Sequence, residues 1–184
     1  MKRMGIPARK TDRHYTYGDF RTWPEDERWE LIDGVAWNMS PAPSVDHQRI
    51  LGRLYLQFAR LLEGRKSDPC EVFLAAVDVF LPVSAGQEMD DVDTVVQPDL
   101  LVEILSPWTS KKDLADKHAL YEGHGVREYL TVDPQGCWVH VYRLGPDRRY
   151  GQPEVRVLEP GRPAGTVRLE VLEGFDLDLA RVFT

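Results

Sequence analysis

The sequence predicts a mixed α/β (α+β) protein in which a central β-sheet is flanked by helices. Two kinds of pattern alternate along its 184 residues. Some segments carry apolar residues at helical spacing, and others are short apolar runs closed by Gly or Pro. Apolar residues make up 42% of the chain, which is enough for one hydrophobic core. We therefore expect a single domain over residues 1–184, with residues 1–14 as a flexible arm.

The first third of the chain predicts a short helix, a hairpin and a long helix. The short helix is expected around TYGDFRTWP, and the hairpin in WELIDGVAWNMSP, where Asp33-Gly34 is a strong turn signal. Residues 44–65 carry apolar side chains every three or four positions. Ser44 is typical of a helix N-cap and Gly64 of a C-cap, so this segment is the clearest helix in the sequence.

The middle of the chain predicts two strands and another helix. Residues 70–82 (CEVFLAAVDVFLP) predict the first strand, and residues 95–106 (VVQPDLLVEILS) predict a nearly apolar strand typical of parallel or central positions. An antiparallel pairing of the two, across an acidic loop centred near residue 88, would bring Asp78 close to Asp99. A helix is then expected from Ser110 to Gly123 or Gly125.

The last third predicts mostly strands. REYLTVDP (127–134) and CWVHVYRL (137–144) have strand character and are separated by a Pro-Gln-Gly turn. Residues 154–183 predict a further hairpin and a closing segment. Together these elements predict a mixed sheet with helices beside it.

Composition and motifs exclude several functional classes. The longest apolar stretch, residues 72–83, contains Asp78 and ends at Pro82 and Val83, so it is too short and too polar to cross a bilayer. The N-terminus has no apolar core of a secretory signal, and we expect a cytoplasmic protein. No P-loop, GxGxxG, GxSxG or zinc-ligand spacing occurs. The net charge of -7 opposes nucleic-acid binding unless a basic face or bound cations offset it.

Two carboxylates interrupt the apolar run at 95–106. Asp99 and Glu103 are about 13 Å apart along an extended strand. A single cation binds its ligands at about 2.1–2.5 Å, so a metal site needs a partner from another strand, for which Asp78 is a candidate. Asp99 follows a proline and equally fits turn chemistry. Glu103 is surrounded by apolar residues, and its burial requires a cation, a metal or a proton beside it.

Lys117 and His47 both have a purely structural interpretation. Lys117 follows Asp113 by four residues, and this spacing alone favours a surface ion pair worth a few tenths of a kcal/mol. His47, near the start of the long helix, is the histidine best placed for a functional role. A lone histidine in that place also fits capping or packing.

Several of these segments, in order, resemble the Uma2 family of endonuclease-like proteins. They are WELIDGVAWNMSPAPSVDHQRILGRL, AAVDVFLP, VVQPDLLVEILSPWTSKKDLADKHALYEGHGVREYLTVDP and VHVYRL. The resemblance covers about residues 15–144 and, weakly, the tail. It implies the fold of the PD-(D/E)XK nucleases, which is a restriction-endonuclease-like central mixed sheet flanked by helices, here with an N-terminal hairpin. It also implies acidic residues that hold a divalent metal.

Carried over residue by residue, the resemblance implies Asp99, Glu103 and Lys117 as catalytic residues. Asp99 and Glu103 would bind the metal. Lys117 would replace the motif lysine, because Leu105 occupies that position here. Glu30 of ELIDG matches a further acidic position and is a weaker candidate for a metal ligand. The implied cofactor is Mg²⁺ or Mn²⁺, the implied substrate is nucleic acid, with DNA preferred, and the implied assembly is a homodimer.

The sequence departs from the family pattern in one respect. Family members commonly carry two separate strands, one with QPD and a later one with a second PD that leads into the glutamate. Here VVQPDLLVEIL runs from the first phrase directly into the last. Either one strand has been lost or Asp99 serves both phrases, and Asp78 becomes a candidate replacement ligand.

Three functions therefore stay open at the level of the sequence. The first is a metal-dependent nuclease. The second is a catalytically inactive relative that binds nucleic acid or a protein. The third is an interaction domain unrelated to nucleic acid, which the acidic net charge favours.

Overall fold

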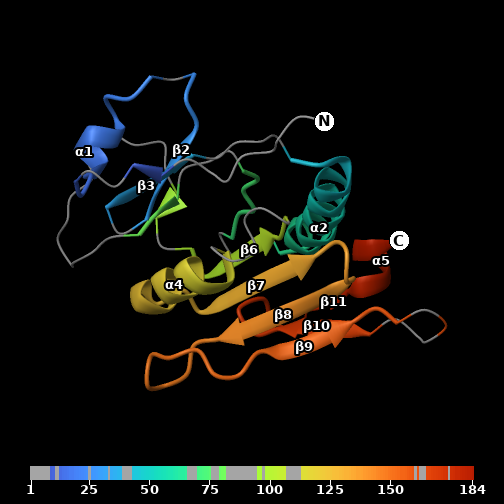
Figure 1. Ribbon diagram of the computed structural model, residues 1–184. Coiled ribbons are helices and arrows are strands. Elements are labelled where there is room, and N and C mark those ends of the chain that lie inside the picture. The colour runs from blue at the N-terminus through green and yellow to red at the C-terminus, as the bar shows by residue number, and fades with distance from the viewer. Residues whose placement is uncertain are drawn as a thin grey trace.

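The centre of the molecule is a four-stranded mixed sheet (Figure 1). The computed structural model describes residues 9–10, 13–24, 26–32, 34–38, 43–65, 70–75, 79–81, 95–96, 98–106, 113–159, 161, 165–173 and 175–184. The sheet has the order β6-β7-β8-β9, with bounds Leu100–Ile104, Glu128–Asp133, Trp138–Arg143 and Glu154–Val157. β6 pairs with β7 in parallel, and the other pairs are antiparallel. The predicted mixed sheet is confirmed.

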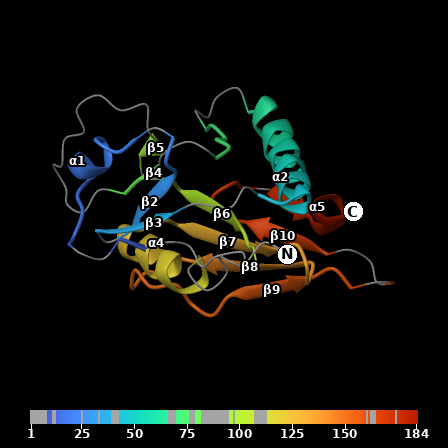
Figure 2. The same cartoon turned by 45° about the horizontal axis from the view of Figure 1, so that its top comes forward.

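Two layers cover this sheet because successive side chains of a strand point to opposite faces. One face packs against helix α2 (Val45–Glu63), helix α5 (Leu179–Phe183) and a hairpin of β10 (Thr166–Leu169) with β11 (Phe175–Asp178). Leu130, Val132, Val139 and Val141 lie at its centre and are buried. The opposite face packs against helix α4 (His118–His124) through a smaller cluster that includes Tyr121 and Tyr129. In Figures 1 and 2, α2 and α4 lie toward opposite ends of the sheet.

The long predicted helix is confirmed as α2. The Ser44 side chain accepts a hydrogen bond from the backbone of His47, and Gly64 follows the last helical residue. Ile50, Leu54 and Phe58, spaced four apart, are buried against the sheet. The helix therefore forms because one stripe of its surface is apolar and its first turn is capped.

The predicted N-terminal hairpin is confirmed as β2 (Trp29–Ile32) and β3 (Val35–Asn38). Gly34 has a φ of 72°, which favours glycine at the turn. A further strand, β1 (Arg9–Lys10), pairs with β3 and falls inside the range 1–14. Helix α1 (Tyr17–Phe20) is shorter than the predicted TYGDFRTWP and begins with a capping box.

The prediction of one strand over 70–82 is wrong. Residues 70–74 have no regular structure, and Phe73 and Leu74 are exposed. The strand β4 is limited to Val79–Phe80, and Asp78 lies outside the described residues. Apolar and β-branched residues form a strand only where a neighbouring strand and a buried face are present. The segment 70–74 is not assigned to a sheet.

The predicted antiparallel pairing and the single strand over 95–106 are also wrong. β5 (Val95–Val96) pairs with β4 in parallel, in a small sheet separate from β6. The fourteen residues 81–94 are long enough for such a crossover, whereas an antiparallel hairpin needs only a tight turn. Pro98 has no N–H to donate to a ladder, and Asp99 lies in a bend. Asp99 therefore precedes strand β6 instead of belonging to it.

The strands and hairpin predicted in the last third are confirmed. β7 and β8 are joined by a turn at 134–137, in which Asp133 accepts hydrogen bonds from the backbone of Gln135 and Gly136. β9 adds a fourth strand to the central sheet, β10 and β11 form the hairpin, and α5 closes the described chain.

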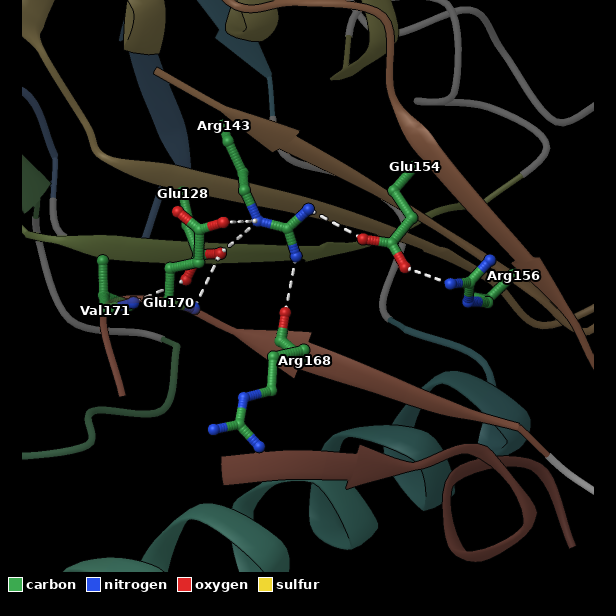
Figure 3. Close-up of polar contacts among 7 residues, drawn as sticks. All are labelled: Glu128, Arg143, Glu154, Arg156, Arg168, Glu170 and Val171. Atoms are coloured by element: carbon green, nitrogen blue, oxygen red, sulfur yellow. Dashed lines mark hydrogen bonds and ion pairs between the residues drawn. The ribbon is translucent and has the colours of Figure 1, made fainter. Parts of the chain in front are cut away.

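A buried ion network ties the hairpin layer to the central sheet (Figure 3). The carboxylate of Glu128, on β7, accepts hydrogen bonds from the backbone of Glu170 and Val171, which follow β10. It also accepts one from Nε of Arg143 on β8 at 3.0 Å. Arg143 in turn donates to Glu154 on β9 and to the backbone carbonyl of Arg168. This network links the strands of the central sheet to the β10–β11 hairpin, so its role is structural.

Candidate carboxylate–lysine site

Lys117 lies at the centre of the strongest polar cluster outside that network. Its side chain is only 9% exposed, although it carries a charge. Nζ donates to Oε1 of Glu103 at 2.6 Å and forms an ion pair with Oε1 of Glu30 at 3.0 Å. The interpretation of Lys117 as part of a surface pair is therefore wrong. The expectation that Glu103 requires a cation is confirmed.

The local structure explains why Lys117 points inward. Residues Asp113–Lys117 form a π-helix that runs directly into α4. A π-helix turn is rare and is found frequently at functional sites. Lys117 and Tyr121 are four residues apart, so both side chains reach the same face of the helix. The Tyr121 hydroxyl also donates to Oε1 of Glu103, at 2.9 Å.

Glu103 and Glu30 come from opposite parts of the chain. Glu103 is the fourth residue of β6, the edge strand of the central sheet, and is partly buried. Glu30 is the second residue of β2 in the N-terminal hairpin and is also partly buried. Lys117 therefore joins the hairpin to the edge of the sheet.

Among the described side chains of this cluster, carboxylates outnumber ammonium groups. Two carboxylates face one ammonium, which leaves a formal charge of -1 for the three side chains when all are ionised. Burial raises the pKa of Tyr121, and the charges of Glu103 and Glu30 raise it further. Tyr121 therefore stays protonated and remains a hydrogen-bond donor to Glu103.

Asp99 lies apart from these contacts. Its side chain is 69% exposed and forms an ion pair of 3.4 Å with Arg127. Its backbone carbonyl accepts a hydrogen bond from Glu128 as β6 begins beside β7. Of the predicted residues, the structure thus brings Glu103, Lys117 and Glu30 into direct contact, and it places Asp99 in an exposed ion pair.

Sequence patterns indicated two further residues, Tyr121 and His47, weakly or not at all. Tyr121 was not predicted, although its spacing from Lys117 was a usable signal. His47 lies in the first turn of α2, whose residue Ile50 packs in the same cluster as Ile104 of β6. Burial lowers the pKa of His47, and the charge of Glu103 opposes this effect.

The donor set of this cluster fits a hard divalent cation. Mg²⁺ is bound in proteins by one or two carboxylates, with water and substrate oxygens completing its shell. Glu30 and Glu103 provide two carboxylates that already share one cationic partner. Among the described residues, no group of three or more His, Cys, Asp or Glu side chains could hold a metal ion. A third protein ligand would have to come from elsewhere in the chain.

The fold and this cluster define an α/β protein with a carboxylate–lysine centre at the edge of a mixed sheet. The model of the Uma2 family, described as "Putative restriction endonuclease", matches residues 17–180. The chain therefore belongs to the Uma2 family.

A solved structure has the same fold. It is described as a "putative nuclease belonging to DUF820" from Anabaena variabilis and superposes with a TM-score of 0.68 at 20% sequence identity. The match covers 91% of this chain and 97% of the Anabaena chain. No curated protein matches the sequence.

No helix in the described ranges combines the length and the apolar character needed to span a bilayer.

Proposed function

We propose that this protein is a metal-dependent phosphodiesterase of the PD-(D/E)XK nuclease type. The observation that carries the proposal is the position of Lys117, which is buried between the carboxylates of Glu103 and Glu30. Two carboxylates can bind a metal that activates water, and a lysine beside them can stabilise charge on a phosphoryl oxygen, which are the contributions that metal-assisted phosphodiester hydrolysis uses. The description of the Uma2 family and the name of the Anabaena protein support the same class of reaction.

The residues have distinct proposed roles. Glu103 and Glu30 are the metal ligands with a direct contact to Lys117. Asp99 remains a proposed ligand, and binding a cation would require it to give up Arg127. Asp78, outside the described residues, remains a further candidate for the missing ligand. Lys117 would hold a phosphate oxygen or the attacking water, and Tyr121 keeps Glu103 oriented.

The proposed cofactor is Mg²⁺ or Mn²⁺. Such an ion, when bound, activates water and stabilises negative charge on a phosphoryl group. The proposed substrate is nucleic acid, with DNA preferred, and the net charge of -7 makes a bridging cation all the more necessary. We also propose a homodimer, which light scattering of the purified protein would test.

The direct test compares three proteins for cleavage of plasmid, short DNA and short RNA with Mg²⁺ or Mn²⁺. They are the wild type, Glu103→Gln and the control Glu63→Gln, whose site lies exposed at the end of α2. We expect Glu103→Gln to lose at least about 100-fold in rate, which corresponds to about 2.7 kcal/mol of transition-state stabilisation. The control should cleave like the wild type. Equal cleavage by Glu103→Gln would exclude this site.

A second candidate function is nucleic-acid or protein binding without cleavage. It is favoured by two observations: Lys117 already occupies both carboxylates, and the described residues contain no three-ligand group. DNA retention that persists in a chelator, falls with salt and gives no product would support this function. Calorimetry that detects a bound divalent ion and its loss in Glu103→Gln would support the enzyme.

A further inference from the structure

Two buried polar atoms of the described side chains have no hydrogen-bond partner. Within the described residues, Thr131 Oγ1 and His47 Nδ1 are the only buried side-chain nitrogen or oxygen atoms that make no hydrogen bond. Buried polar groups are almost always paired, and each exception calls for an explanation. Thr131 is the cross-strand partner of Glu103, and the charge of Glu103 acts on His47.

Thr131 is placed next to Glu103 by the pairing of β6 with β7. The two residues are directly paired in the parallel register, so their side chains point to the same face of the sheet. Neighbouring strands are about 4.8 Å apart. Thr131 is fully buried, at 0% exposure. Its hydroxyl thus faces the same side as the carboxylate that Lys117 and Tyr121 hold.

His47 lies on a different element. It is in the first turn of α2, one turn before Ile50, which belongs to the same buried cluster as Ile104 of β6. Its ring is half-buried, and the charge of Glu103 acts on it. Two elements that are separate in the sequence, α2 and β7, therefore each carry an unpaired polar atom on a residue related to Glu103, Thr131 by strand pairing and His47 by electrostatic interaction.

We propose that Thr131 and His47 are substrate-binding residues whose unpaired atoms hold phosphate oxygens of the phosphodiester beside Glu103. The proposal rests on the proposed function and names two residues that the family resemblance did not suggest. The threonine hydroxyl donates a hydrogen bond, and the imidazole donates when Nδ1 carries the proton. An unpaired buried hydroxyl lowers the stability of the free protein, and a bound phosphate would satisfy it.

Thr131→Val separates a binding role from a structural one because it replaces the hydroxyl with a methyl group of similar shape. If the hydroxyl is unpaired in the free protein, the variant should melt at least about 2 °C higher than the wild type. A hydroxyl with a structural partner gives the opposite result, a lower melting temperature, and that result would overturn the proposal.

The binding readout is thermal stabilisation by inorganic phosphate in the presence of Mg²⁺. We expect phosphate to raise the melting temperature of the wild type, and Thr131→Val and His47→Leu to lose at least half of this rise. Thr166→Val, at an exposed position of β10, is the matched control and should keep the full rise. A rise that is absent in the wild type overturns the proposal. If a variant keeps the full rise in melting temperature, the residue that it replaces does not bind phosphate.

The cleavage assay distinguishes failure of this inference from failure of the proposed function. If the wild type cleaves and Glu103→Gln does not, Thr131→Val should cleave at least about tenfold more slowly, which is about 1.4 kcal/mol. Cleavage by Thr131→Val at the wild-type rate overturns the inference alone. If the wild type does not cleave but binds phosphate through Thr131, the proposed function fails and the anion site stands.

Discussion

At the scale of single residues, the fold buries a lysine that forms ion pairs with two carboxylates. Breaking a buried ion pair by removing one partner costs more than never having formed it, because the other charge stays in a poorly solvated place. Lys117 has two such partners, Glu103 and Glu30. Replacing Lys117 by a neutral residue therefore leaves two partly buried carboxylates without its ammonium group.

We predict that Lys117→Met lowers the free energy of unfolding by about 3 kcal/mol in a chelating buffer. Mg²⁺ should recover part of this loss and raise the melting temperature of the variant more than that of the wild type, because the two carboxylates then lack the ammonium of Lys117. Thermal melts with EDTA and with Mg²⁺ measure both effects. Arg49→Met, which breaks an exposed pair with Asp46, is the control and should change stability by less than about 0.5 kcal/mol.

The sequence could predict part of this site. The apolar neighbours of Glu103 required a cation, and that requirement holds in the structure. The identity of the cation could not follow from spacing, because the i, i+4 relation of Lys117 to Asp113 is the ordinary pattern of an exposed helix. The π-helix that turns Lys117 inward has no sequence signature we could use. Glu30 entered only through the family resemblance, because hairpin docking is a non-local contact.

At the scale of elements, local sequence signals predicted helices and hairpins correctly, whereas the pairing of strands distant in the sequence was not predicted correctly. Helix α2 and the β2–β3 hairpin are encoded by caps, turn residues and periodicity within a few residues of each other. The parallel pairing of β4 with β5 depends on a fourteen-residue connection and on what covers it. Asp99 was predicted to lie within the strand, whereas Pro98 and the bend at Asp99 precede the start of β6.

We predict opposite effects for two glycines at the end of α4. Gly125 has a φ of 80°, and a Cβ there would lie 3.1 Å from a guanidinium nitrogen of Arg148. Gly125→Ala should therefore lower stability by about 1 kcal/mol. Gly123 lies within the helix with open space beside it, and Gly123→Ala should raise stability by about 0.5–1 kcal/mol. Urea unfolding of the two variants tests this sign difference, and equal effects would contradict it.

The Glu128 network should control how firmly the β10–β11 hairpin is held. Glu128→Gln replaces an ionised acceptor of two backbone N–H groups and Arg143, and we expect a loss of about 3 kcal/mol. Glu154→Gln affects the outer, partly exposed end of the network and should cost less. Hydrogen exchange of residues 166–178 should rise in the first variant. Equal losses in both variants would show that Glu128 is not the anchor.

The contact of α4 with the segment after β8 should depend on pH. A hydrogen bond from the backbone of Tyr150 and another from Arg149 hold the pKa of Glu122 below its ordinary value. A depressed carboxyl pKa stabilises the folded state fully above the unfolded pKa of about 4.3, and the effect is lost as the pH falls through the folded pKa. The stability difference between wild type and Glu122→Gln should therefore shrink below about pH 4. A difference that grows in acid would reverse this assignment.

At the scale of the whole molecule, the charge of the protein limits how it meets a polyanion. A net charge of -7 repels nucleic acid at long range, and the Lys117 cluster adds to this locally. Divalent cations reduce both effects. Under the proposed function, a bound divalent metal would therefore assist substrate binding as well as reaction.

We predict that DNA binding measured by fluorescence anisotropy is at least about tenfold tighter with Ca²⁺ or Mg²⁺ than with EDTA at equal ionic strength. Glu30→Gln should reduce this metal dependence, because one of the two adjacent carboxylates is lost. Glu173→Gln lies outside the cluster, removes the same charge from the whole molecule and is the control. Metal-independent binding would point to a basic surface instead.

The hairpin that carries Glu30 also gives the protein an internal optical probe. Trp29 precedes Glu30 on β2, and Trp37 on β3 is the direct cross-strand partner of Glu30. Indole emission responds to nearby charge, so a cation or phosphate that displaced Lys117 from Glu30 would change the light emitted by these two tryptophans. Trp138, on the central sheet, is another of the five tryptophans in the chain. We therefore expect ligand binding at the proposed carboxylate–lysine centre to change the intrinsic fluorescence, without any attached label.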